Sequence, residues 1–412
     1  MTGKPPFACD TGTHRALDQQ QPSAAWLAIF SLAFGIFGLV TAELLPVSIL
    51  TPMANDLGAS KGAVGQAVTT TGLVAAISGP IVVAGMGTID RRTIIIGLML
   101  LMVGSCILAA IATSVAVLLL ARAMLGVALG GSYGLTTALA LRIVPSAQVP
   151  RAISTVAMGV SLAIVLATPL AVAIGEILGW RATFLAVACV GAVALLIQLL
   201  ALPRLPASGG TDAAAFRKAL SRRGVQVGIV ASIIIIAGHF AGFTFIRPFL
   251  ETVPRLSFET LSMALFAFGI AGIAGNMAAG VVAARSPASA FAASALLITL
   301  AATILIFFGR STGGAFSATA LWGFAFGGVP VAASIWNARI ASDIAEPAGA
   351  LLASAFQIAI ASGALIGGVL IDTVGPEAPV AFAGAATLIG GAFMGVIGRA
   401  LETPHTLEED TV

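Results

Sequence analysis

The sequence predicts an all-α, polytopic membrane protein with about twelve transmembrane helices in two six-helix halves. Two features of composition predict this fold class: 58% of the 412 residues are hydrophobic and only 9% are charged. An ordinary soluble domain carries roughly a quarter charged residues, so this chain lacks the charge to cover a surface in water. The third observation is a succession of long apolar runs separated by short polar segments. We therefore expect lipid to surround most of the molecule.

The apolar runs form two sets, and each run is long enough for a spanning helix, which needs about 20 residues. The first set lies at 25–50, 62–86, 93–113, 115–141, 152–176 and 180–202. The second set lies at 226–250, 258–283, 287–309, 314–338, 347–371 and 378–400. The predicted division is a tail at 1–23, a half at 24–202, a central loop at 203–225, a half at 226–400 and a tail at 401–412. The first tail is polar and has no cleavable hydrophobic region, so it is not a signal peptide.

The distribution of positive charge predicts the orientation of the chain. Lysine and arginine concentrate on the cytoplasmic side of membrane proteins. With the amino terminus inside, fourteen of the 20 basic residues are cytoplasmic, four lie on the opposite side, and Arg122 and Arg247 lie within spans. Both tails and the central loop are therefore predicted to be cytoplasmic. The basic segment of that loop, Arg217 to Arg223, suits anionic lipid headgroups better than nucleic acid, and no nucleic-acid partner is expected.

Glu43 is the only carboxylate that we place within a span. An ionised group inside a membrane is costly and by default indicates function. Glu43 lies about 18 residues, or roughly 27 Å, from the start of the first span, and Arg122 lies at a similar depth in the fourth. We predict that both take part in proton coupling. Two alternatives are that Glu43 sits in water at the outer interface and that Arg122 only joins helices through backbone carbonyls. Whether the two side chains pair directly is left open.

Other polar side chains within spans are candidates for a substrate cavity. His239, Phe243 and Arg247 follow one another at intervals of four residues, which places them near one helical face. Histidine can bind a polar solute or relay a proton, although it can equally be a satisfied bundle residue, and Arg247 can be an interface anchor. A flat heteroaromatic solute would suit aromatic stacking and amide hydrogen bonds. The further candidates, which could also simply join helices, are Gln357, Asn276, Gln66, Thr70 and Tyr133.

Several motifs occur in order along the chain. They are Ala42-Glu43-Leu44-Leu45-Pro46, Asp90-Arg91-Arg92, Arg122-Ala123-Met124-Leu125-Gly126, Gly159 through Pro169, Gly179-Trp180-Arg181 and Phe243 through Pro248. On these residues the chain resembles the major facilitator superfamily, specifically its twelve-span drug:proton antiporters, and among them the bacterial exporters of purine ribonucleosides. The resemblance covers nearly the whole chain after the first twenty or so residues. It implies the major facilitator fold and alternating access driven by a proton gradient.

The resemblance also assigns gating residues. Asp90, Arg91 and Arg92 correspond to a charged cytoplasmic gate, although the family's longer loop is shortened here. Pro169 belongs to the antiporter motif of the fifth span, where Thr168 replaces the usual glycine. Both departures weaken a direct copy of the family's gating scheme.

A secondary transporter is the function that these observations favour. The expected solutes are purine ribonucleosides and their analogues, with sugars or hydrophobic drugs as the alternative. An enzyme or a channel is more remote, because the sequence has neither a metal or nucleophile constellation nor a Walker phosphate loop. We expect no cofactor, since the proton gradient supplies the driving force. The chain is expected to act as a monomer in the bacterial inner membrane, with a small molecule, protons and lipids as its partners.

Overall fold

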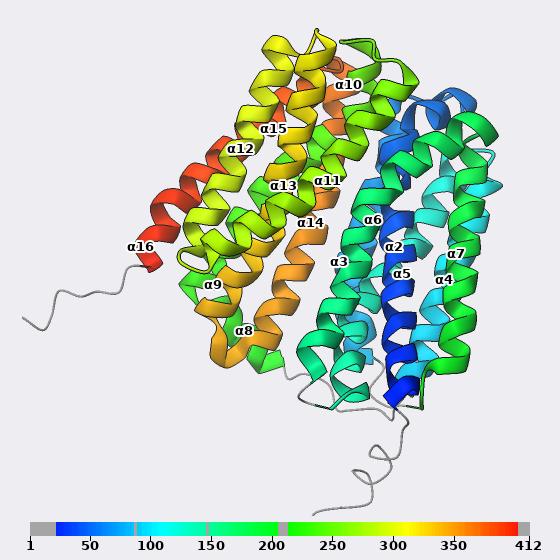
Figure 1. The fold of residues 1–412 in the computed structure, drawn as a ribbon, viewed down its shortest axis with the longest axis vertical. Coiled ribbons are helices and arrows are strands. Elements are labelled where there is room, and N and C mark those ends of the chain that lie inside the picture. The colour runs from blue at the N-terminus through cyan, green and yellow to red at the C-terminus, as the bar shows by residue number, and fades with distance from the viewer. Residues whose placement is uncertain (1–21, 86–88, 146–147, 205–212, 403–412) are drawn as a thin grey trace, which may run out of the picture.

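The computed structural model describes residues 22–85, 89–145, 148–204 and 213–402, and these are helical nearly throughout. The first half of the chain forms one bundle and the second half forms another beside it (Figure 1). The helices of the first bundle are α2 (Pro22–Asp56), α3 (Lys61–Gly85), α4 (Arg91–Ala110), α5 (Val115–Ile143), α6 (Val149–Leu178) and α7 (Trp180–Ala201). The predicted tails lie largely outside the described residues.

The second bundle follows a short helix, α8 (Ala213–Ser221), which lies inside the predicted central loop. Its long helices are α9 (Arg223–Phe243), α11 (Phe258–Ala283), α12 (Pro287–Phe308), α13 (Thr312–Ile340), α14 (Ala345–Thr373) and α15 (Ala378–Phe393). The shorter elements are α10 (Ile246–Thr252), a 3₁₀ turn at Ser342–Ile344, a π-helical turn at Met394–Gly398 and α16 (Arg399–Glu402).

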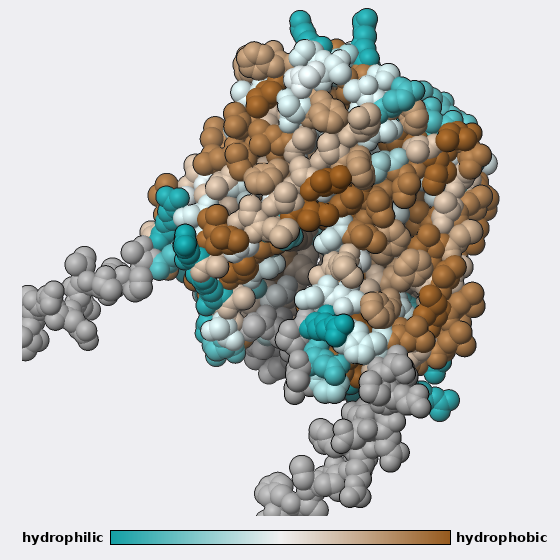
Figure 2. All heavy atoms as spheres, in the orientation of Figure 1, coloured by the Kyte–Doolittle hydropathy of each residue, from teal (hydrophilic) through white to brown (hydrophobic). Residues whose placement is uncertain are grey.

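Eleven helices in the described part are long and apolar enough to cross a membrane. The other long helix, α3, has 25 residues, and Gln66 and three consecutive threonines make its first half more polar. Large apolar side chains are exposed along the flanks, such as Ile177 at 77% and Leu200 at 87%. Figure 2 shows this apolar surface as a broad brown belt between more polar ends. A surface of this kind is stable in lipid and not in water, so the chain is a multi-pass membrane protein.

Serine and aspartate side chains begin many of these helices. Asp90, Ser114, Ser257, Ser286 and Ser311 each accept a hydrogen bond from a backbone N–H in the first turn of the following helix. Such caps satisfy donors that the helix itself leaves unpaired. The short polar segments between apolar runs therefore determine where each span starts.

Prolines interrupt two spans that the apolar pattern predicts as continuous. The predicted span 226–250 is two helices, α9 and α10, because Pro248 has no N–H and its ring crowds the carbonyl four residues earlier, at Thr244. Helix α2 continues six residues beyond the predicted end at residue 50 and is kinked at Ile49, between Pro46 and Pro52. Both changes occur at the end of the molecule that carries α10, which we call the upper end (Figure 1).

The two halves contact each other mainly through α3 against α14 and through α6 against α11. Glycine allows the backbones to approach at both places. A Cβ at Gly72 of α3 would lie 2.9 Å from the Gln357 carbonyl oxygen, and one at Gly269 of α11 would lie 2.8 Å from the Val165 Cα. The surface is hollowed between the halves toward the lower end, opposite α10 (Figure 2). The halves thus meet along two narrow seams, and side chains at these seams can respond to relative motion.

Candidate functional site

Glu43 lies on α2 in the first half, at the seam with the second half. The side chain of Gln357, from α14, is a hydrogen-bonding neighbour of its carboxylate, and Arg122 and Tyr133 interact with it electrostatically. Its Oε1 atom is buried and has no hydrogen-bond partner among the described residues. The alternative that Glu43 sits in water at an interface therefore does not fit the structure. A carboxylate in this position can bind a proton, or the donor group of a solute.

Arg122 binds the backbone of α2 rather than the Glu43 carboxylate. Its Nη1 donates a hydrogen bond of 2.8 Å to the Ala42 carbonyl, and its guanidinium lies 4.7 Å from the centre of the Phe184 ring. The Ala42 carbonyl lacks its usual helical donor because the residue four positions later is Pro46. The proline thus creates the acceptor that positions the arginine. Arg122 joins helices through a carbonyl, as one alternative held, and still places its charge beside Glu43.

Arg247 has a corresponding arrangement at the upper end, but across the two halves. Its Nη1 donates to the Ser48 carbonyl at 2.6 Å, and that carbonyl is free because Pro52 follows four residues later. The same guanidinium pairs with Glu251 at 2.6 Å and with Glu176 of α6 at 3.0 Å. Thr51 donates to the second oxygen of Glu251 at 2.6 Å. We call these five residues, Ser48, Thr51, Glu176, Arg247 and Glu251, the Arg247 cluster.

A second set of bonds joins the halves near the Arg247 cluster. Asp372, at the end of α14, accepts hydrogen bonds from the Ser60 hydroxyl at 2.5 Å and from the Gly62 N–H at 3.0 Å. Among the described residues at the lower end, the hydrogen bonds lie within each half: Arg222 binds Asp343 at 2.5 and 2.6 Å, and Arg92 donates to the Leu199 carbonyl. The upper end is therefore tied shut between the halves.

Sequence reasoning missed the carboxylates of this upper closure. Glu176 is the last residue of the predicted run 152–176, α11 includes Glu259, and α14 extends beyond residue 371 to include Asp372, so Glu43 is not the only carboxylate in a spanning helix. One signal was present, since Glu251 follows Arg247 by four residues, the spacing of neighbours on a helix. The contacts to Glu176 and Asp372 join residues far apart in the chain and had no local signal.

His239 is buried in the second half within a group of aromatic rings. Its ring is stacked on Phe326 with 3.5 Å between centroids, and it also stacks with Phe243 at 5.1 Å. Its Nδ1 accepts a hydrogen bond of 2.9 Å from the Trp322 indole, so the neutral ring carries its proton on Nε2, which is buried without a partner among the described residues. The structure thus brings His239 and Phe243 together, and the break before α10 places Arg247 elsewhere.

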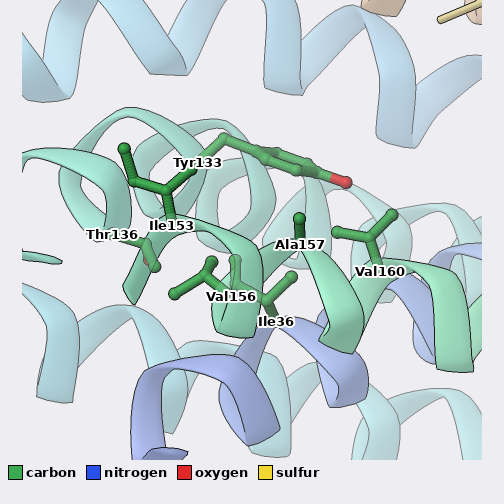
Figure 3. Close-up of a pocket in the computed structure, with 7 residues that line it drawn as sticks. All are labelled: Ile36, Tyr133, Thr136, Ile153, Val156, Ala157 and Val160. Carbon is green, nitrogen blue, oxygen red and sulfur yellow. The ribbon is translucent and has the colours of Figure 1, made fainter. Parts of the chain in front are cut away.

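The other predicted cavity residues are dispersed. Tyr133, the only tyrosine, forms one side of a cavity of about 170 Å³ that also includes Ile36, Thr136, Ile153, Val156, Ala157 and Val160. Its ring lies across the apolar side chains of α6 (Figure 3). Gln66 and Thr70 are half-buried on α3, and the Gln66 amide lies near Gly368 of α14 at the seam. Asn276 is exposed on α11 beside Met277 and is not brought to this site.

The predicted gating residues lie in the first half. The Asp90 side chain caps α4 by accepting from the Arg92 N–H at 2.8 Å, and Arg91 is buried. Pro169 is half-buried within α6, and it leaves the Val165 carbonyl without a helical donor at the seam with Gly269. The segment 86–88, which precedes Asp90 in the chain, lies outside the described residues. The role of Asp90, Arg91, Arg92 and Pro169 in gating stays a prediction.

Two helical bundles joined at seams, with buried polar groups between them, define a membrane transporter of the kind that works by relative motion of its halves. The family model of the Major Facilitator Superfamily matches residues 25–350. The chain is also 39% identical, over 364 residues, to the "Purine ribonucleoside efflux pump NepI" of Salmonella paratyphi C (strain RKS4594), which covers 88% of this chain and 92% of that relative. The relative of the same name from Shigella sonnei (strain Ss046) is 37% identical over the same shares. The chain belongs to the Major Facilitator Superfamily, and it is a transporter rather than an enzyme.

Solved structures show the same fold. A bacterial homolog of the human lysosomal transporter Spinster, in an inward-facing and occupied conformation, has a TM-score of 0.75 at 16% identity. That comparison covers 92% of this chain and 98% of the other. The human organic anion transporter MFSD10 has a TM-score of 0.66 at 16% identity, covering 91% and 100%.

Proposed function

We propose that this protein exports purine ribonucleosides and their analogues from the bacterial cytoplasm in exchange for protons, by alternating access. The observation that carries the proposal is the position of the Glu43 carboxylate between the halves. One of its oxygens has no hydrogen-bond partner among the described residues, and Gln357 of the other half is its neighbour. The names of the relatives support the choice of solute. One chain supplies both halves of the path, which supports action as a monomer.

The proposed cycle starts from the arrangement in the structure, with the upper end closed by the Arg247 cluster and Asp372. The basic side chains near the lower end, including Arg92 and Arg222, support a cytoplasmic lower end and thus cytoplasmic termini in the inner membrane. A solute enters from the cytoplasm and binds near Glu43. After the upper end opens, a proton from outside binds Glu43 and the solute leaves. Proton and solute must favour different states, since otherwise the gradient does no transport work.

Arg122 has a defined part in this cycle. Its permanent positive charge beside Glu43 favours the ionised carboxylate, whereas burial favours the protonated one. Its attachment to the Ala42 carbonyl holds that charge at a constant place while access changes. The balance between the two influences allows Glu43 to gain and lose a proton as its exposure alternates.

Exchange of labelled inosine in proteoliposomes with an imposed pH gradient tests the proposal. We expect flux to follow the gradient and to stop when an ionophore collapses it. Glu43→Gln, which keeps the shape but cannot titrate, is expected to lose gradient-driven flux by about a hundredfold or more. Glu377→Gln, at an exposed carboxylate before α15, is the matched control and is expected to keep it. Inosine flux that ignores acidity on both sides would contradict the proposal.

A further inference from the structure

Two neighbouring side chains from opposite halves each carry a buried oxygen atom that has no hydrogen-bond donor among the described residues. The two atoms are Oε1 of Glu43, on α2, and Oε1 of Gln357, on α14, and neither has a partner among the described residues. The two side chains are neighbours, since the Gln357 amide acts as a hydrogen-bond partner of the Glu43 carboxylate. An ionised carboxylate oxygen and an amide oxygen can only accept hydrogen bonds. Buried acceptors without partners are rare, so this pair calls for a ligand with donors.

The surroundings of these oxygens limit what that ligand can be. The close approach of Gly72 to the Gln357 carbonyl keeps α3 and α14 packed on one side. Tyr133 lies near enough to Glu43 to interact with it, and its ring borders the apolar cavity between α2, α5 and α6 (Figure 3). An apolar cavity with an aromatic wall suits a flat ring, and the two acceptors beside it suit a polar group attached to that ring.

We infer that the Glu43 and Gln357 oxygens together accept hydrogen bonds from the vicinal ribose hydroxyls of the solute, so that the site selects ribonucleosides over deoxyribonucleosides. A cis-diol offers two donors on adjacent carbons, which matches two acceptors from two side chains. The cyclic amide edge of a hypoxanthine base instead offers one N–H donor beside a carbonyl oxygen. That carbonyl can only accept a hydrogen bond, so it could not pair with the second of the two protein oxygens. This inference rests on the proposed function and names which part of the solute that site reads.

The inference also explains why a proton and a solute would exclude each other. Protonation of Glu43 places a donor on one carboxyl oxygen and removes the negative charge that strengthens a hydrogen bond from a hydroxyl. The diol then loses its stronger partner while Gln357 still accepts. Because the two acceptors come from different halves, a bound diol also bridges α2 of the first half and α14 of the second. Proton binding and solute release therefore act on the same atoms.

Competition by unlabelled analogues tests the inference on the wild-type protein. Labelled inosine exchange is measured in proteoliposomes in the presence of inosine, 2′-deoxyinosine, 3′-deoxyinosine or 2′,3′-dideoxyinosine. Loss of the hydroxyl that binds the charged Glu43 is expected to weaken competition about tenfold or more, and loss of the hydroxyl that binds the neutral Gln357 about fivefold. Equal competition by inosine and both monodeoxy analogues, while inosine is still carried, overturns the diol inference and leaves nucleoside export standing. If the protein carries no nucleoside, both fail together.

Variants of Gln357 assign the second acceptor. Gln357→Leu is expected to reduce the preference for inosine over 2′,3′-dideoxyinosine about fivefold or more, while Gln357→Glu, which keeps an acceptor oxygen, is expected to keep the preference. Gln226→Leu, at an exposed glutamine near the start of α9, controls for loss of an amide and is expected to leave the preference unchanged. A Gln357→Leu protein that elutes as a single species and discriminates like wild type excludes Gln357 as the acceptor. If that variant does not fold, the analogue series on the wild type still decides the inference.

Discussion

Arg122 and Arg247 are bound in the same way to the same helix and yet do different work. Each donates to an α2 carbonyl that a proline four residues later leaves free, Ala42 before Pro46 and Ser48 before Pro52. Arg122 makes its contact within the first half and lies beside a phenylalanine ring, whereas Arg247 reaches across from the second half and pairs with two carboxylates. The comparison teaches that the same local feature, a carbonyl left without its helical donor by a proline, can serve two purposes. At Ala42 it holds the Arg122 charge inside one half, and at Ser48 it forms a bond between the two halves.

The largest effect is expected from Arg122→Met, which removes the fixed charge inside the first half. The Ala42 carbonyl loses its donor, and we expect the free energy of unfolding to fall by about 2 kcal/mol. Gradient-driven inosine flux should fall about a hundredfold, because the positive charge no longer opposes the effect of burial on Glu43. Arg122→Lys keeps a charge and a donor and should keep part of both. Thermal unfolding in detergent and proteoliposome flux measure the two effects, and full flux in Arg122→Met would show that the charge is not needed.

The next effect is expected from Arg247→Gln, which removes the bond between the halves. We expect the upper end to open more often, by about tenfold in population, with little change in the stability of either half. Spin labels at the exposed positions Asn55 and Val374, in a chain without other cysteines, measure the separation of the halves at the upper end. Arg310→Gln, at an exposed arginine after α12, is the control. A distance distribution identical to that of the wild type would mean that the Arg247 cluster does not close the upper end.

Substitution of the two prolines tests whether they make the Ala42 and Ser48 carbonyls available to the arginines. Pro52→Ala restores an N–H that competes for the Ser48 carbonyl, and Pro46→Ala does the same at Ala42. We expect Pro52→Ala to open the upper end a fewfold, by the same spin-label measurement, and Pro46→Ala to change inosine flux without opening it. Each effect is expected to be about 1 kcal/mol or less, since the arginine keeps its other contacts. If both substitutions had the same phenotype, the two arginines would not have separate roles.

The smallest effect is expected at the lower end, where Arg222 and Asp343 pair within the second half. The Arg222 guanidinium holds the pKa of the Asp343 carboxyl below its ordinary value. The pair therefore stabilises the folded state above the ordinary aspartate pKa of about 3.9, and this contribution is lost as the pH falls through the lower folded-state pKa. Asp343 is half-exposed, so solvent screens the pair, and Asp343→Asn should hardly change the melting temperature at pH 7. A large loss of melting temperature at neutral pH would show that this pair is more than a surface contact.

Much of the fold was predictable from local patterns. The runs of apolar residues located the long helices, because lipid forces each spanning segment to satisfy its own backbone hydrogen bonds as a helix. The exceptions are the break between α9 and α10 and the extension of α2 past residue 50, where prolines act within an apolar run. A hydropathy pattern contains no information on the backbone N–H that a proline lacks. It therefore predicted one uninterrupted span where the structure has the two helices α9 and α10.

The candidate site was predictable only in part. Glu43, Arg122, His239 and Arg247 were singled out because polar groups inside a membrane are costly. The partners of these residues were not, since Ala42 and Ser48 contribute backbone oxygens and Glu176 lies far along the chain from Arg247. Gln357 was one polar candidate among several until the packing of α14 against α3 placed it beside Glu43.

By itself the sequence determined that this chain spans a membrane, that its helices form two sets, and which few charged residues lie within the spans. Each of these follows from the free energy of transferring side chains between water and hydrocarbon. Only the tertiary structure decided which carbonyl each arginine binds, which carboxylates close the upper end, and that Glu43 and Gln357 face each other from opposite halves. The neighbouring positions of Glu43 and Gln357 follow from the packing of α3 against α14, where the backbones approach closely at Gly72, and contacts between distant segments have no local signature in the chain.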